Sequence, residues 1–204
     1  MLRMNGVSFN LYFASFFCNL TVLYFIMYAG LLITVVAFDV ASLTLAPAFG
    51  TMALLYLLYM PSALIYSGAM SYLFDKSETA RQFYPNMATT IGFITYTCVS
   101  LIDLLVVDSN AGTILHIVFT VTLPYYIPFG ILYYINKVYL TCTLQNTCDS
   151  LVFADYMNLE ISIMLLMCIV NTPIYFMVLR VVDARKSGGD LREALFLKVS
   201  SKIG

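Results

Sequence analysis

The stretch Thr113–Asn136, which reads TILHIVFTVTLPYYIPFGILYYIN, decides how the chain is arranged. It is as long and as apolar as a membrane span, but Pro124 and Pro128 interrupt it near its centre. Proline inside a helix removes a backbone hydrogen bond and clashes with the preceding turn, so each half is only about ten residues long. Since a span needs about 20 apolar residues, two half-length helices that meet at a proline turn predict a re-entrant hairpin.

The composition of the whole chain indicates an integral membrane protein. Hydrophobic residues form 61% of the 204 positions, charged residues form 10%, and the mean hydropathy is +0.89. A soluble domain is about 45–50% apolar and about 25% charged, so this chain could not cover a surface that faces water. The net charge of −1 and the sparse lysines and arginines give no reason to expect a nucleic-acid partner.

Four other stretches are long and apolar enough to cross the membrane as helices. They are Leu11–Phe38, Leu43–Phe74, Phe83–Val107 and Leu159–Val182. The expected fold class is therefore all-α integral membrane, a helical bundle of four spanning helices over residues 11–182 plus a re-entrant outer helical hairpin at 113–136. Residues 1–10 and 183–204 would form a cytoplasmic tail and a cytoplasmic connector on either side of the bundle.

The positions of the basic residues favour the hairpin over a fifth full crossing. With a hairpin, Lys137 alone is on the outer side, and the other basic residues share one side: Arg3, Lys76, Arg81, Arg180, Arg185, Lys186, Arg192, Lys198 and Lys202. A full crossing would move the last six of these to the opposite side. Because cytoplasmic loops carry the excess of Lys and Arg, both termini are expected in the cytoplasm, and residues 113–158 on the outer or lumenal face. The membrane would be the plasma membrane or that of an intracellular vesicle.

Two of the cysteines fall on the predicted outer side, in the segment YLTCTLQNTCDS that covers residues 139–150. An oxidising compartment would allow Cys142 and Cys148 to pair and close this loop. The alternative is two free thiols.

The sequence contains no motif for catalysis, for a metal site or for nucleotide binding. It has no G-x-x-x-x-G-K-[ST] loop and no Cys/His metal spacing. His116 is the one histidine, and we expect a structural or interfacial role for it. Asp103, near the outer end of the third span, is either a functional charge in the membrane or a wetted interfacial residue. Pro61 and Pro173 predict kinks in their spans, which serve either packing or a hinge motion.

Six short motifs follow one another in an order that is similar to a known family. They are Leu2 with Gly6-Val7, Tyr12 and Ser15; Leu54–Tyr59 with Pro61 and Tyr66; Phe74 with Ser77–Ala80; Ile91–Phe93 with Asp103; Pro124–Leu132; and Asp155. In this order they resemble the second half of the membrane domain of ATP-binding cassette transporters of subfamily A, the lipid exporters. The chain departs from that pattern at Asn19-Leu20, where the family has Trp-Asp, and at Gly130-Ile131, where it has Gly-Arg.

The resemblance implies a fold and a function that the residues alone do not give. Met1–Ser8 would be the remaining tail of a cytoplasmic coupling element, and Pro124–Leu132 would form short outer helices that dip into the membrane. The chain would be part of an exporter of lipid or another hydrophobic substrate, and a fragment, since the family's nucleotide-binding domains and large extracellular domain are not in the sequence. The candidate transport or coupling residues are Gly6, Val7, Asp103, Pro61 and Pro173.

The implied partners are membrane lipids, a nucleotide-binding domain that holds ATP and Mg, and the other transmembrane half of the transporter. No catalytic, cofactor-binding or metal-binding residue is expected in this chain. Two other functions stay open. One is a small non-catalytic tetraspan scaffold or assembly protein, and the other is a membrane-embedded enzyme that uses Asp103, Glu160 or His116.

Overall fold

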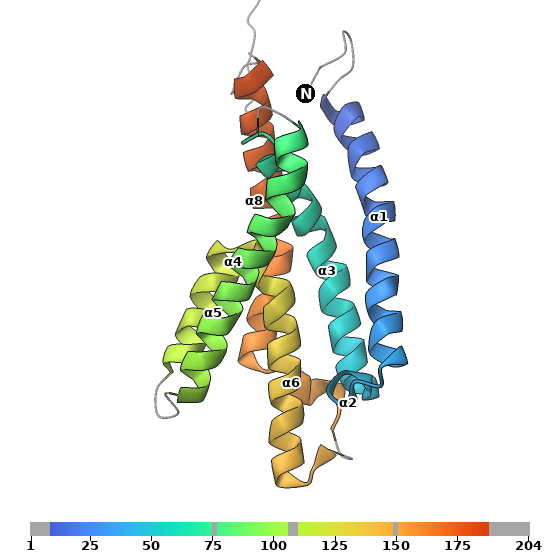
Figure 1. The fold of residues 1–204 in the computed structure, drawn as a ribbon, viewed down its shortest axis with the longest axis vertical. Coiled ribbons are helices and arrows are strands. Elements are labelled where there is room, and N and C mark those ends of the chain that lie inside the picture. The colour runs from blue at the N-terminus through green and yellow to red at the C-terminus, as the bar shows by residue number, and fades with distance from the viewer. Residues whose placement is uncertain (1–8, 75–76, 106–109, 149–150, 188–204) are drawn as a thin grey trace, which may run out of the picture.

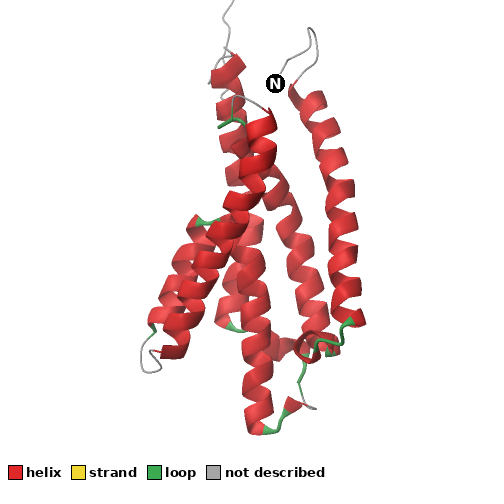
Figure 2. Ribbon diagram, viewed as in Figure 1, coloured by secondary structure: helices red, strands yellow, loops and turns green. Residues whose placement is uncertain are grey.

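The computed structural model describes residues 9–74, 77–105, 110–148 and 151–187, and its regular secondary structure there is entirely helical (Figure 2). The helices are α1 Phe9–Ala37, α2 Ala41–Thr44, α3 Ala46–Ser71, α4 Ser77–Leu105, α5 Ala111–Thr122, η1 Pro124–Tyr126, α6 Ile127–Gln145, α7 Phe153–Tyr156 and α8 Leu159–Ser187. The expected all-α class is therefore confirmed.

Four helices, α1, α3, α4 and α8, are long and apolar enough to cross a membrane, as a multi-pass protein requires. Their limits differ from the expected spans at several ends. The stretch expected to start at Leu43 is broken at Leu45, because Pro47 lies in the first turn of α3, where proline favours a helix start. Helix α4 starts at Ser77, ahead of the expected Phe83. Helix α8 continues past the expected Val182 to Ser187, into the expected connector, the rest of which lies outside the described residues.

The ends of these four helices define the two ends of the molecule (Figure 1). The start of α1, the end of α3, the start of α4 and the end of α8 lie together at the top of Figure 1, which we call the upper end. The opposite end, with α2 and α7, is the lower end. The described ends of the chain, Phe9 and Ser187, are thus both at the upper end.

Helix α3 is the centre of the bundle. It contacts α1, α2, α6, α7, α8 and η1, and its pairing with α8 is the most extensive among the described helices. Met52 and Leu55 of α3 join Ile127 and Ile131 of the hairpin and Met164 of α8 in one buried cluster. Helix α1 is peripheral, since only 6% of its apolar segment is buried inside the bundle, compared with 44% of the apolar segment of α3. Its apolar surface is therefore left for lipid.

The segment with the two prolines folds as a pair of helices that meet at a sharp bend. Helix α5 runs from the lower end to the middle of the bundle, η1 turns the chain, and α6 runs back to the lower end (Figure 1). The two arms are bent by 117° at the break. We call α5, η1 and α6 the hairpin. It lies between α4 on one side and α3 with α8 on the other.

Candidate functional site

The turn of the hairpin, which we call the apex, is buried in protein. Pro124, Tyr125 and Tyr126 of η1 are buried, and so are Ile127 and Gly130 at the start of α6. Backbone that is not helical is tolerated at membrane depth only where protein covers it or where it lines a water-filled cavity. The apex meets the first condition.

Two tyrosines of α3 supply hydrogen bonds to the apex. Pro128 has no N–H, so the carbonyl of Pro124 lacks its usual donor four residues on, and Ile127 N–H reaches it in a 3-10 turn instead. The Tyr59 hydroxyl donates to this carbonyl at 3.0 Å. The Tyr56 hydroxyl, on the same face of α3, donates to the Pro128 carbonyl at 2.9 Å. Helix α3 therefore fixes the position of the apex.

Helix α4 reaches the other side of the apex at Gly92. A Cβ atom on Gly92 would lie 2.5 Å from the Phe129 ring and 2.7 Å from the carbonyl oxygen of Tyr125. Only a residue without a side chain allows the two segments to come this close, the packing role that small residues have between membrane helices. The apex is thus held between Gly92 and the tyrosines of α3.

Asp103 joins the three helices that meet near the base of the hairpin. Its Oδ2 accepts hydrogen bonds from Lys137 Nζ and from the Tyr133 hydroxyl, each at 2.6 Å, so it bridges α4 and α6. Gly112 of α5 also packs on it, since a Cβ there would lie 2.9 Å from Asp103 Cβ and Oδ1. The side chain of Asp103 is 16% exposed and that of Lys137 is 42% exposed. Asp103 is therefore a mostly buried carboxylate with a charged partner.

His116 links the hairpin to the last span. Its side chain is fully buried, with Nδ1 2.8 Å from the Tyr126 hydroxyl and Nε2 3.1 Å from the carbonyl oxygen of Glu160. A carbonyl only accepts, which assigns the proton to Nε2 and makes Nδ1 the acceptor from Tyr126. The imidazole is then neutral and both nitrogens are engaged, an arrangement that suits a structural role.

The structure supports no metal centre in the part of the chain that it describes. There, no three His, Cys, Asp or Glu side chains come close enough to hold a metal ion. Of the three residues considered for an embedded enzyme, His116 contacts Glu160 through the backbone carbonyl of the latter. Asp103 is engaged with Lys137 and Tyr133 instead.

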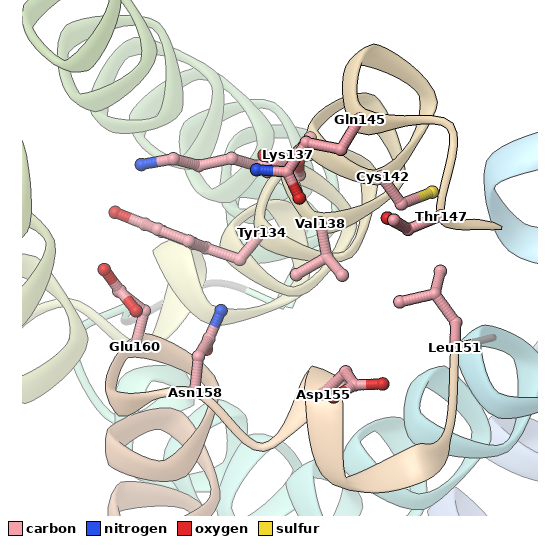
Figure 3. A pocket seen from close by; sticks show the side chains of 11 residues that line it. Tyr134, Lys137, Val138, Cys142, Gln145, Thr147, Leu151, Asp155, Asn158 and Glu160 are labelled. Carbon is pink, nitrogen blue, oxygen red and sulfur yellow. The ribbon is translucent and has the colours of Figure 1, made fainter.

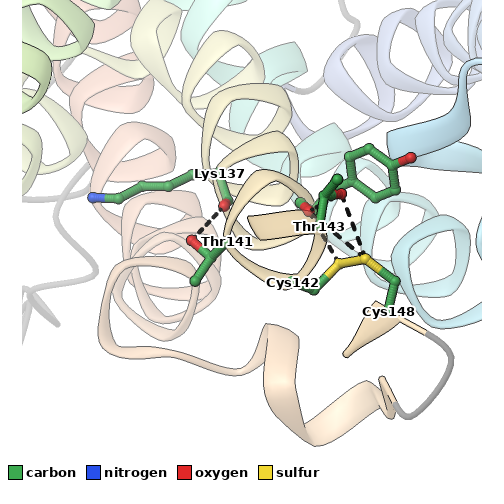
Figure 4. Close-up of a disulfide and its surroundings, with 6 residues drawn as sticks. Lys137, Thr141, Cys142, Thr143 and Cys148 are labelled. Carbon is green, nitrogen blue, oxygen red and sulfur yellow. Dashed lines mark hydrogen bonds between the residues drawn. A yellow bond between two sulfur atoms is a disulfide. The ribbon is translucent and has the colours of Figure 1, made fainter. Parts of the chain in front are cut away.

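The loop that follows α6 contains a disulfide and borders a groove. Cys142 and Cys148 are joined, with their Cα atoms 4.9 Å apart, and the bond closes the C-terminal end of α6 (Figure 4). Asn146, inside the closed loop, ends α6 in a left-handed conformation with φ of 56°, which Asn tolerates better than most residues. Between α6, this loop, α7 and the start of α8 lies a groove of about 430 Å³ (Figure 3).

The remaining candidate residues lie away from these contacts or outside the description. Gly6 and Val7 fall outside the described residues. Pro61 lies inside α3 and Pro173 inside α8, and both helices continue through them. A role of these prolines in motion stays a prediction. The sequence did not reveal Tyr56 and Tyr59 as anchors, although their spacing of three in LLYLLY puts both on one helix face.

Replacing Tyr59 by Phe is expected to lower the free energy of unfolding by about 0.5–1.5 kcal/mol, because the Pro124 carbonyl would lose its side-chain donor and keep only Ile127 N–H. Thermal unfolding of the purified chain in detergent, followed by circular dichroism, measures this. Tyr156→Phe is the matched control, since the buried Tyr156 hydroxyl has no hydrogen-bond partner in the described structure. Burial raises the pKa of Tyr156, so its hydroxyl is neutral. Equal melting temperatures for Tyr59→Phe and the unmodified chain would contradict the anchor.

Removing either partner of the Asp103–Lys137 ion pair is expected to destabilise the fold, and the effects of the two substitutions should not add. Asp103→Asn and Lys137→Met should each lower the free energy of unfolding by about 1–2 kcal/mol, with the double variant less destabilised than the two single effects together. Glu78→Gln, at an exposed site on the upper end, removes a carboxylate without touching the hairpin and should change little. Chemical unfolding of the four chains gives the coupling energy. A coupling energy of zero would show that the pair does not stabilise the hairpin.

Comparison with known proteins does not assign the chain to a family. No protein-family model, no curated protein and no solved structure matches it. The resemblance to the lipid-exporting cassette transporters therefore rests on the quoted motifs and their order, and the function that it implies is a proposal.

Proposed function

We propose that this chain is a membrane-domain portion of an ATP-binding cassette transporter of the lipid-exporting A subfamily. It would move lipid or another hydrophobic substrate across or out of the bilayer, with ATP and Mg bound in a nucleotide-binding domain elsewhere. The observation that carries the proposal is the hairpin, two arms bent by 117° that lie between the third and last of the four long helices, α4 and α8. In the family that the motifs resemble, short outer helices that dip into the membrane take this place.

We infer that the hairpin is re-entrant and that both termini are cytoplasmic. Helix α5 has 12 residues, which at about 1.5 Å per residue is too short for a hydrocarbon core of about 30 Å. The buried and hydrogen-bonded apex supports a turn inside the membrane. Arg180, Arg185 and Lys186 lie toward the end of α8, at the upper end, so the rule that cytoplasmic segments are basic places that end in the cytoplasm.

The contacts between helices provide a route by which a push at the cytoplasmic end would reach the hairpin. At the upper end the Tyr72 hydroxyl donates to Asp183 Oδ1 at 2.7 Å, and Lys186 Nζ donates to the Tyr72 carbonyl, so α3 and α8 are tied together. Further down, α3 holds the apex through its two tyrosines, and α8 holds α5 through His116. ATP-driven closure of the missing domain would therefore tilt α3, α8 and the hairpin as one unit.

The apolar surface of the bundle suits an acyl chain as cargo. Most of the apolar segment of α1 faces outward, and its exposed side chains are large and apolar, among them Leu23, Ile26 and Met27. An acyl chain needs an apolar surface of this kind and no polar channel. Lipid would move along the outside of the bundle, over the exposed face of α1.

Topology is tested with single cysteines introduced at exposed positions on the two ends. In a background with Cys18 and Cys98 replaced by alanine, Leu144→Cys at the lower end should react with a membrane-impermeant maleimide from outside. Glu78→Cys at the upper end should react only from the cytoplasmic side. Labelling of both positions from the same side would mean that residues 113–136 cross the membrane fully, and the hairpin would be excluded.

Transport is tested with the complete coding sequence around these codons. We expect it to encode a G-x-x-x-x-G-K-[ST] loop, and the full product in proteoliposomes to move a fluorescent lipid only when ATP is present. Tyr59→Phe should slow this movement by several-fold, since the apex would be less firmly held by α3, whereas Tyr156→Phe should not. A coding sequence without a cassette would reject the exporter and favour the tetraspan scaffold.

A further inference from the structure

The groove beside the disulfide loop has the size of a small-ligand site. Its volume of about 430 Å³ lies within the roughly 300–1,000 Å³ that such sites occupy. Its walls come from α6, the outer loop, α7 and the first turn of α8. Glu160 lies in that first turn, at the start of an apolar span, so on the proposed topology the groove opens at the depth of the outer headgroups.

One wall of the groove carries hydrogen-bond donors that are not used within the chain. Tyr134 is fully buried, and its hydroxyl has no partner in the described structure. Lys137, one helical turn further along α6, uses one donor on Asp103, and an ammonium group has three. Figure 3 shows the Tyr134 hydroxyl and the Lys137 ammonium on the same side of the groove. A buried donor without an acceptor is unfavourable, so an anionic oxygen bound here would remove that cost.

The facing wall carries acceptors. Glu160 and Asp155 both line the groove, and the Glu160 carboxylate lies beside the Tyr134 hydroxyl in the view of Figure 3. Of the described lining residues only Lys137 is basic, and its charge is already balanced by Asp103. The two carboxylates therefore give this wall an excess of negative charge that favours a cation.

We propose that the groove binds a phosphate ester that carries a primary ammonium group, as the headgroup of phosphatidylethanolamine does. The phosphate accepts from the Tyr134 hydroxyl and from Lys137, and the ammonium group donates to Glu160, which lies beside Tyr134 in Figure 3, while Asp155 adds to the negative charge of the groove. A primary ammonium fits better than a quaternary one, which prefers an open aromatic face, because Lys137 Nζ already lies 5.5 Å from the centre of the Tyr134 ring. The site rests on the proposed function for its depth in the membrane, and it deepens that function by naming a headgroup.

The test measures binding of lipids to the purified full chain in detergent. Phosphatidylethanolamine with a fluorophore on its acyl chain should bind about tenfold more tightly than the matching phosphatidylglycerol, which has the phosphate but no ammonium group. Glu160→Gln should remove this preference. Tyr134→Phe should weaken both lipids by several-fold, and it keeps the fold because the hydroxyl that it removes has no partner in the described structure. Tyr156→Phe, which removes a buried hydroxyl that does not line the groove, should bind as the unmodified chain does.

Two results would overturn the site: equal binding of the two lipids by the unmodified chain, or unchanged binding in both Glu160→Gln and Tyr134→Phe. Competition with water-soluble O-phosphoethanolamine separates the two sources of this chemistry. Displacement at equal concentration assigns the site to the free compound, and displacement only at a large excess assigns it to the lipid. The binding measurement needs no ATP, so it is independent of the transport test. If no lipid preference is found, the headgroup site is rejected but the exporter is not. If the coding sequence encodes no cassette, the exporter is rejected but the binding data still stand.

Discussion

The hydrogen bonds that reach the Pro124 and Pro128 carbonyls at the apex are the constraint on which the hairpin depends. In hydrocarbon no water is present to pair with a free carbonyl, and a buried acceptor left without a donor costs about 1–3 kcal/mol. Pro128 removes the usual donor of the Pro124 carbonyl, Ile127 N–H replaces it in a 3-10 turn, and the tyrosines of α3 add a further donor to each of the two proline carbonyls. The position of the apex in the bundle is therefore set by the central helix, which also packs against α8.

The hairpin is held by different chemistry at its two levels. At the apex the donors are neutral hydroxyls from Tyr56 and Tyr59, which enter a low-dielectric interior at modest cost. Near the base the contact is an ion pair, Asp103 with Lys137, and the lysine side chain is 42% exposed. A charge is costly in the middle of a bilayer and much less so near the surface. On the proposed re-entrant topology, the order of the contacts thus follows the polarity of the membrane.

The sequence predicts the elements of this fold better than their contacts. Span lengths identify the four long helices, and two prolines four residues apart identify the break between α5 and α6, because both are local properties of the chain. The partner of Tyr59 is a backbone carbonyl 65 positions away, and any residue has a carbonyl, so no residue type marks it. Asp103 was singled out as an unusual charge, but its pairing with Lys137 depends on how α6 returns along α4.

The contacts also indicate which parts of the bundle can move separately. The hairpin, α3 and α8 are joined by Tyr59 at the apex and by His116 at α5, so displacing one of them strains hydrogen bonds to the others. Helix α1 keeps most of its apolar surface outside, but Tyr24 and Tyr28 donate hydrogen bonds to backbone carbonyls of α3, so displacing α1 would break these two bonds. For the proposed exporter, a unit joined in this way could transmit force from the upper end to the hairpin, while the outward face of α1 would be the surface that meets the acyl chains.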